Sequence, residues 1–202
     1  MNDDPAERAR AWLHDAQGAV CDLIQPWAHG TVVRATRYPS YWDFNVVRVE
    51  EESELSAEAL AAFSDEALSG LAHRRVDLEL AAAAEPLRAD FRALGWLTTR
   101  LVWMRHEGPA PSAPEIPVEP VPYEALNDLR VTWHGEDFPD NPLGDYLVHA
   151  REVALLRDTE VLAVLENDAP VAYAQLTPTA GPPRSSRSTS VPITAVGGSA
   201  RR

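Results

Sequence analysis

EVLAVLENDAPVAYAQLT, residues 160–177, is the stretch of sequence that decides the fold. Apolar residues fill or alternate along its two arms, 160–166 and 170–177, and the tripeptide NDA at 167–169 separates the arms. Asn and Asp tolerate the backbone angles of tight hairpin turns. The stretch therefore predicts an antiparallel β-hairpin. Because a lone hairpin is only marginally stable in water, other elements of the chain must cover it.

The sequence before the hairpin predicts two helices and a linker. Residues 123–133 (YEALNDLRVTW) and 145–156 have a helical spacing of apolar side chains, and the loop HGEDFPDNPLG lies between them. Two helices and two strands are too few to enclose a core by themselves. Farther upstream, GPAPSAPEIPVEPVP at 108–122 contains six prolines, a composition typical of an extended, semi-rigid linker.

Residues 1–108 predict a more complete module in which helices and strands alternate. Ser56 is suited to cap the start of a helix, Gly95 is suited to end one, and Trp96 and Trp103 are expected in the core. The expected helices are 5–24, 56–68 and 82–94, and the expected strands are 31–38, 42–50, 74–80 and 98–105. An acidic loop at 50–54 connects the second strand to the second helix.

Composition restricts the kind of protein and its partners. No apolar run in the 202 residues approaches the ~20 that a membrane helix needs. The net charge of −13 disfavours nucleic acids and anionic membranes, because phosphate binding depends on Lys and Arg. The single cysteine, Cys21, fits a reducing cytoplasm. We interpret it as a buried structural thiol, since the neighbouring Asp22 opposes a reactive one.

The segment 179–202 (TAGPPRSSRSTSVPITAVGGSARR) differs from everything before it. It contains four Arg and no acidic residue, whereas 109–178 contains thirteen acids and three Arg. Ser, Thr, Pro and Gly dominate the segment, and such a composition buries too little apolar surface to offset the entropy of ordering. We expect a disordered tail that does not belong to the fold before it.

Three segments carry a family resemblance. FRALGWLTTRLVWMRHE (91–107) reads as a helix, an aromatic-tipped turn and a strand. VEPVPYEALNDLRVTWHGEDFPD (118–140) reads as a strand and the start of paired helices, and VLAVLENDAPVAYAQL (161–176) is the hairpin. In this order they resemble the GNAT superfamily of N-acetyltransferases in its tandem arrangement.

The resemblance implies a mixed α/β (α+β) fold with two acyl-CoA N-acyltransferase modules. The expected division is a degenerate GNAT-like module at 1–108, a Pro-rich linker at 109–122, the N-terminal half of a second module at 123–178, and the tail.

Acetyl transfer from the co-substrate acetyl-CoA to an amine of a small molecule or peptide is the activity that the resemblance implies. The family holds the pyrophosphate on backbone N–H groups in a loop of the form Q/R-x-x-G-x-G/A after its fourth strand. The first module has VEEESELSAEAL (49–60) in that place, with no glycine and with five glutamates that repel a pyrophosphate. We interpret this stretch as a solvated acidic loop rather than a metal site, since it lacks histidine.

The activity is therefore expected to be impaired in this chain. The alternative is a non-catalytic acetyltransferase-like protein that binds a ligand or a partner. In the second module the pyrophosphate loop should follow Leu176, where the tail stands. Codons for VPITAVGGSARR (191–202), read in a shifted frame with free third bases, allow SDHRGRGIGTA, which contains a loop of the family's form. The tail is either that loop read out of frame, which leaves the module truncated, or an authentic linker-like terminus.

The region that borders the acceptor site in the resembling family begins at Trp133. The loop expected after it contains His134, Glu136 and Asp137, and any of these would act as the general base for an incoming amine. The alternative is a turn that ends the helix and carries solvated acids.

Further candidates lie on the expected strands. Tyr41 and Trp42, at the turn between two strands, line an acceptor pocket or face the core. Tyr173 and Gln175 lie on one face of the hairpin, near where the family places acetyl-CoA. No histidine pair has the i, i+4 spacing of a helical metal site, so no metal is expected. The exposed hairpin edge indicates a possible homodimer contact.

Overall fold

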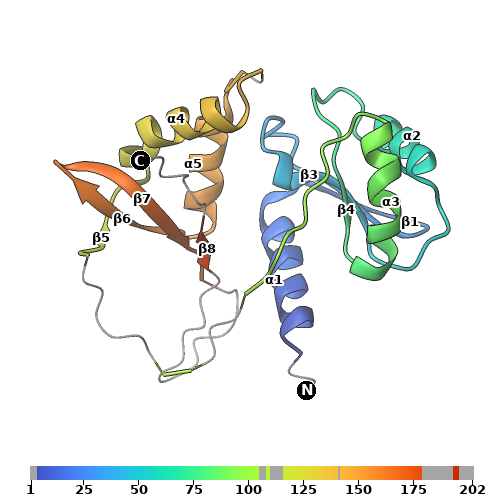
Figure 1. Ribbon diagram of the computed structural model, residues 1–202, viewed down its shortest axis with the longest axis horizontal. Helices are drawn as coiled ribbons and strands as arrows, with labels where there is room; N and C mark the ends of the chain where they lie inside the picture. Colours follow the sequence, from blue (N-terminus) through green and yellow to red (C-terminus); the bar gives the residue numbers. More distant parts are fainter. Residues whose placement is uncertain (1–3, 105–107, 110–115, 141, 179–192, 196–202) are drawn as a thin grey trace. The chain divides into compact units, whose positions relative to one another are not determined.

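The computed structural model describes residues 4–104, 108–109, 116–140, 142–178 and 193–195. The chain divides into two compact units. We call Leu13–Val102 the meander unit, and Met1–Trp12 with Trp103–Arg202 the hairpin unit. The described residues form five α-helices and two four-stranded sheets, so the expectation of a mixed α+β fold is confirmed (Figure 1).

The meander unit is built on a sheet whose strands follow one another in the order β1-β2-β3-β4. β1 and β2 are antiparallel, as are β2 and β3, whereas β4 runs parallel to β3 after the crossover helix α2. The helices α2 and α3 lie side by side next to β4 (Figure 1). The elements are α1 (Pro5–Val20), which belongs to this unit from Leu13 on, β1 (Leu23–Trp27), β2 (Gly30–Arg34), η1 (Trp42–Phe44), β3 (Asn45–Val49), α2 (Ala57–Ala67), β4 (Val76–Leu78) and α3 (Ala81–Ala93).

The central strand β3 is buried along its whole length and separates two differently covered faces. Val47 packs with Leu68, and Val49 packs with residues of α2 and α3. Because successive side chains of a strand alternate, Arg48 points to the opposite face, where its guanidinium meets Gln17 of α1. Val47 and Val49 thus face α2 and α3, and Arg48 faces α1.

Two local signals of the sequence are confirmed in this unit. The hydroxyl of Ser56 accepts a hydrogen bond from the backbone N–H of Ala59 and caps α2, and Gly95 follows α3 with a positive φ of 84°. Gly30 has another role. A Cβ atom at this position would lie 2.3 Å from the carbonyl oxygen of Arg48, so only glycine allows β2 to approach β3 here.

The hairpin unit contains the hairpin that the sequence predicts. Asn167 and Asp168 form its two-residue turn with φ angles of 51° and 64°. Its sheet is antiparallel throughout, in the order β5-β6-β7-β8. The other elements are η2 (Tyr123–Leu126), α4 (Asn127–Asp137), α5 (Tyr146–Leu156), β5 (Glu119–Pro120), β6 (Glu160–Glu166), β7 (Ala169–Leu176) and β8 (Ile193–Ala195).

Three expected elements of the first module are corrected. The first helix ends at Val20, not near residue 24, because Leu23–Trp27 pairs with β2. The apolar periodicity extends into this strand, and Pro26 is tolerated there because β1 is an edge strand. The strands expected at 31–38 and 42–50 are shorter than predicted, and η1 lies between them.

The strand expected at 98–105 is also wrong for the residues that the structure describes. Thr98–Met104 has no strand partner there, and Leu101, Val102 and Met104 are exposed. A strand forms only where a neighbouring strand offers backbone partners. Trp96 does pack against the core, whereas Trp103 is exposed and its ring contacts Trp12.

Parts of the expected linker and tail form short strands in the hairpin unit. Glu119–Pro120 pairs with β6, and Ile193–Ala195 pairs with Ala174, Gln175 and Leu176 of β7. Residues 179–192 and 196–202 lie outside the described part, so the disordered or out-of-frame tail stays a prediction. The homodimer contact along the hairpin edge also stays a prediction. Among the described helices, none combines the length and the apolarity needed to cross a membrane.

Candidate functional site

Two glutamates lie side by side where the parallel strands of the meander unit end. Val49 pairs with Leu78, and the backbone N–H of Glu79 donates to the carbonyl of Val49 at 3.0 Å. Glu50 and Glu79 are therefore the next residues of the two strands in the same register. Since Val49 and Leu78 pack toward α2 and α3, both carboxylates lie on the α1 face.

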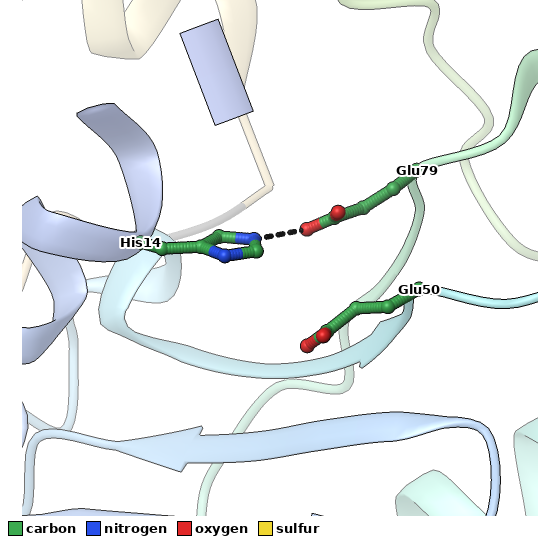
Figure 2. A group of neighbouring side chains, drawn as sticks. All are labelled: His14, Glu50 and Glu79. Carbon is green, nitrogen blue, oxygen red and sulfur yellow. Dashed lines mark hydrogen bonds and ion pairs between the residues drawn. The ribbon is translucent and has the colours of Figure 1, made fainter. Parts of the chain in front are cut away.

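His14 of α1 completes this group. Its Nε2 lies 2.7 Å from Oε1 of Glu79, and Figure 2 shows the imidazole and both carboxylates converging on one space. One ligand atom from each of His14, Glu50 and Glu79 lies within 4.8 Å of the others. The side chain of Glu79 is only 9% exposed, whereas that of His14 is 34% exposed. The group is thus open to solvent from the side of the helix.

Arg48 is the cation next to this group. Its Nη2 lies 2.9 Å from Oε1 of Glu50, and its Nη1 donates to Oε1 of Gln17 at 2.7 Å. The approach to Glu50 does not have hydrogen-bond geometry, so Oε1 of Glu50 is buried without a hydrogen bond. Arg48 therefore offsets one negative charge electrostatically and does not saturate the carboxylate of Glu50.

An imidazole nitrogen with two carboxylates is a donor set that divalent transition metals accept. Sequence reasoning missed it, because the three residues come from α1 and from the ends of β3 and β4. The acidic loop has no histidine close to it in the sequence, but His14 lies close to Glu50 in space. The parallel register of β3 and β4, together with the position of α1, supplies the missing member.

A second polar cluster surrounds Arg130 of α4 in the hairpin unit. Arg130 is buried, its Nη1 donates to the hydroxyl of Tyr123, and its Nη2 donates to that of Tyr146 at 3.1 Å. The guanidinium carbon lies 5.0 Å from the centre of the Tyr123 ring and 5.2 Å from that of Tyr146. No ion pair joins Arg130 to a carboxylate in the described part of the chain. Phenol oxygens and ring faces hold this charge instead.

Three candidates from the sequence join the Arg130 cluster. The ring of Trp133 stacks on that of Tyr173 at 5.4 Å, and Nε2 of Gln175 donates to the hydroxyl of Tyr123 at 3.4 Å. Burial raises the pKa of the Tyr173 phenol, and the nearby Arg130 opposes the rise. This phenol is therefore a neutral hydrogen-bonding group at physiological pH.

His134, Glu136 and Asp137 lie on α4 rather than in the expected loop. The helix continues to Asp137, and its carboxyl-terminal cap N–H, from Phe138, donates to the carbonyl of His134. Gly135 is helical here and therefore does not end the helix. His134 has its ring 6.1 Å from that of Tyr146, whereas Glu136 and Asp137 are exposed. Only His134 of these three candidates lies beside the Arg130 cluster.

Tyr41 and Trp42 lie in the meander unit, where β2 leads into β3. Tyr41 packs its ring edge against Phe44, and Trp42 stacks on His73 at 5.4 Å. Trp42 is exposed, whereas the neighbouring Phe44 is buried. A role of Tyr41 and Trp42 in an acceptor pocket stays a prediction.

Cys21 follows α1 and is half-buried. Its thiol donates to the carbonyl of Phe44 at 3.4 Å. Burial, followed by the negative charge of Asp22, raises the pKa of Cys21 to about 12. The direction of this shift supports the interpretation as a structural thiol, since a nucleophilic cysteine needs a lowered pKa.

The meander unit also has two hollows. One of about 310 Å³ lies over β1, β2 and α2 and includes Trp27, Arg34, Phe63 and Glu66 in its lining. The other, of about 490 Å³, lies between 52–54 and the start of α3.

Comparison with known proteins found no matching family model, curated protein or solved structure.

Proposed function

We propose that this chain has the architecture of a GNAT-type N-acetyltransferase, which transfers an acetyl group from acetyl-CoA to an amine. One observation carries the proposal: in the meander unit a helix leads into three antiparallel strands, and a crossover helix then leads into a fourth strand parallel to the third. The sequence resemblance assigns the cofactor loop to the connection between β3 and α2.

The chemistry of this connection lowers the expected affinity for the cofactor. A helix N-terminus attracts a pyrophosphate through its free N–H groups. Here Ser56 already satisfies one of these N–H groups, and Glu51, Glu52 and Glu54 are exposed in the loop before it. Their charges oppose an anion at the start of α2, so we propose weak acetyl-CoA binding by the meander unit.

We assign the acceptor to the hairpin unit, together with the acetyl-CoA that the sequence resemblance places near Tyr173 and Gln175 of the same unit. In acetyl transfer, the neutral amine attacks the thioester carbon, the C–S bond breaks, and the amine proton passes to a base. We assign the base to His134, because it is the one candidate next to Tyr146 and Arg130. The aromatic pair Trp133–Tyr173 supplies an apolar wall nearby.

Titration calorimetry with acetyl-CoA tests the proposal, followed by mass spectrometry of acetylated products from a panel of amines. The variant Glu51→Gln/Glu52→Gln/Glu54→Gln should bind acetyl-CoA more tightly, because it removes three repelling charges. A matched control, Glu119→Gln/Glu160→Gln/Glu166→Gln, removes three exposed charges from the hairpin unit and should leave the affinity unchanged. Equal effects of the two variants would reject a cofactor site at the start of α2.

A non-catalytic binding protein is the second candidate function, and the hollow over β1, β2 and α2 favours it. The rings of Trp27 and Phe63 stack there with their centres 4.3 Å apart, and Arg34 and Glu66 supply charges of both signs. Such a lining suits a small ligand with an apolar body and a polar group. Ligand-dependent thermal stabilisation without turnover would favour this candidate over acetyl transfer.

The out-of-frame origin of 179–202 is a separate part of the proposal. Sequencing the gene through these codons and beyond decides it. A shifted frame that continues into an acetyltransferase-like end supports the origin that we propose, and a frame without one contradicts it.

A further inference from the structure

The charges at the ends of β3 and β4 are not balanced by the protein alone. Glu50 and Glu79 are neighbours in a parallel register on one face of the sheet. Like charges that lie opposite each other on adjacent strands are destabilising, and partial burial increases the repulsion. Arg48 offsets one of the two charges. A cation bound between the two carboxylates would stabilise the group further.

The donor atoms lie close to the spacing that a metal site needs. Ligands of Zn²⁺ lie about 2.0–2.2 Å from the ion, so two ligand atoms on one ion are roughly 3–4 Å apart. The atoms of His14, Glu50 and Glu79 lie within 4.8 Å of one another, and rotation of these side chains closes the difference. Oε1 of Glu50 is buried without a hydrogen bond, so coordination of this carboxylate breaks none at that atom.

We propose that His14, Glu50 and Glu79 bind one divalent transition-metal ion, for which Zn²⁺ is the test ion. The imidazole favours Zn²⁺ over Mg²⁺ and Ca²⁺, which prefer all-oxygen sites. Three protein ligands leave one position of a tetrahedral ion for water, and the exposed side of His14 gives access to it.

The ion would join α1 to the carboxyl ends of β3 and β4. In open sheets with parallel strands, ligands bind beyond this end of the strands. The hollow between 52–54 and the start of α3 lies only a few residues along the chain from both glutamates. The proposal does not depend on acetyl transfer, because it is argued only from the three side chains and Arg48, although Glu50 begins the connection that the sequence resemblance assigns to the cofactor loop.

The experiment uses the full chain after treatment with a chelator and desalting. Titration calorimetry with ZnCl₂ should give one ion per chain, and ZnCl₂ should raise the melting temperature. CoCl₂ should give visible d–d absorption bands at the same stoichiometry. His14→Ala and Glu79→Gln should each weaken Zn²⁺ binding at least about tenfold, the lower bound for the loss of even an outer-shell partner.

Two matched variants are the controls. Glu52→Gln removes an equal charge from the adjacent loop, and His29→Ala removes a histidine from the same unit. Both should keep the affinity within about twofold, well below a tenfold step of 1.4 kcal/mol. Far-UV circular dichroism checks that each variant folds, and Glu50→Gln replaces Glu79→Gln if the latter does not.

Two results would overturn the proposal. Absence of Zn²⁺ binding by the folded wild-type chain would mean that His14, Glu50 and Glu79 form a hydrogen-bonded cluster and not a metal site. Equal losses in Glu52→Gln and Glu79→Gln would place the ion on the exposed acidic loop instead.

Discussion

The two units each bury an arginine, and they stabilise its charge in opposite ways. Arg48 is 5% exposed and Arg130 is 7% exposed. Arg48 lies against the amide of Gln17 and the carboxylate of Glu50. Arg130 lies against the hydroxyls and ring faces of two tyrosines. In the meander unit a carboxylate stabilises the charge of the arginine, whereas in the hairpin unit the dipoles and π electrons of tyrosines stabilise it.

The two arginines differ in the groups that would remain if the arginine were replaced by a neutral residue. Around Arg130 only neutral phenols and an amide would stay behind. Around Arg48 two adjacent carboxylates would stay behind, one of them on a side chain only 9% exposed. Equal burial of two arginines therefore does not imply that the fold depends equally on both. The sign and number of its neighbours decide the dependence.

The largest expected effect is that of Arg48→Met. The variant leaves Glu50 and Glu79 side by side without the arginine, and the free energy of unfolding should fall by about 3–5 kcal/mol, as for other broken buried pairs. Urea denaturation followed by circular dichroism measures it. Adding Glu50→Gln to this variant should restore part of the loss. If the double variant is no more stable than Arg48→Met, the repulsion between the carboxylates is not the cause.

Arg130→Met should have a smaller effect, because no carboxylate is left uncompensated. The loss of charge-assisted hydrogen bonds and ring contacts predicts a decrease of about 1.5–3 kcal/mol in the same measurement. Arg130→Lys should recover only part of it, since an ammonium group does not reproduce the planar fork that reaches both tyrosine hydroxyls. A loss as large as that of Arg48→Met would contradict the comparison.

The stability of the meander unit should depend on pH through His73. Burial lowers the pKa of His73, and Arg74 and Arg75 lower it too, against a hydrogen bond to the carbonyl of Asn45. Below pH 6.5, its ordinary pKa, the unfolded chain therefore binds more protons at this position than the folded chain. The contribution of His73 to stability is fully present above that pH and decreases as the pH falls. His73→Gln should flatten the fall of the urea midpoint between pH 7 and pH 5, and an unchanged slope would assign the fall to other groups.

Cys21 is expected to affect stability least. Its prediction therefore concerns the rate at which the thiol is alkylated. With a pKa of about 12, the folded protein should react with iodoacetamide at pH 8 at least about a hundredfold more slowly than free cysteine. Urea should restore the rate. Asp22→Asn should change the rate little, because burial is the main cause of the raised pKa. Rapid labelling of the folded chain would mean that the thiol is open to solvent.

Local signals in the sequence predicted the elements that depend on nearby residues. The Asn167-Asp168 turn, the Ser56 cap and the stop at Gly95 all act within a few residues of themselves. Thr98–Met104 has the same apolar character as a strand, yet no strand partner lies beside it in the described part of the chain. The end predicted for the helix at Trp133 is also wrong, because α4 continues to Asp137. It passes through Gly135, and the low helix propensity of glycine indicated a stop there.

The candidate site divides in the same way. The sequence by itself determined which residues are able to bind, accept or lose a proton, and it indicated Trp133 and His134 in one region and Tyr173 and Gln175 in another. Only the tertiary structure brought these two sets together around Arg130 and placed His14 beside Glu50 and Glu79. Periodicity and capping are set by neighbours along the chain. Contacts between α1, β3 and β4 depend on strand register and helix packing, which no short stretch of sequence specifies.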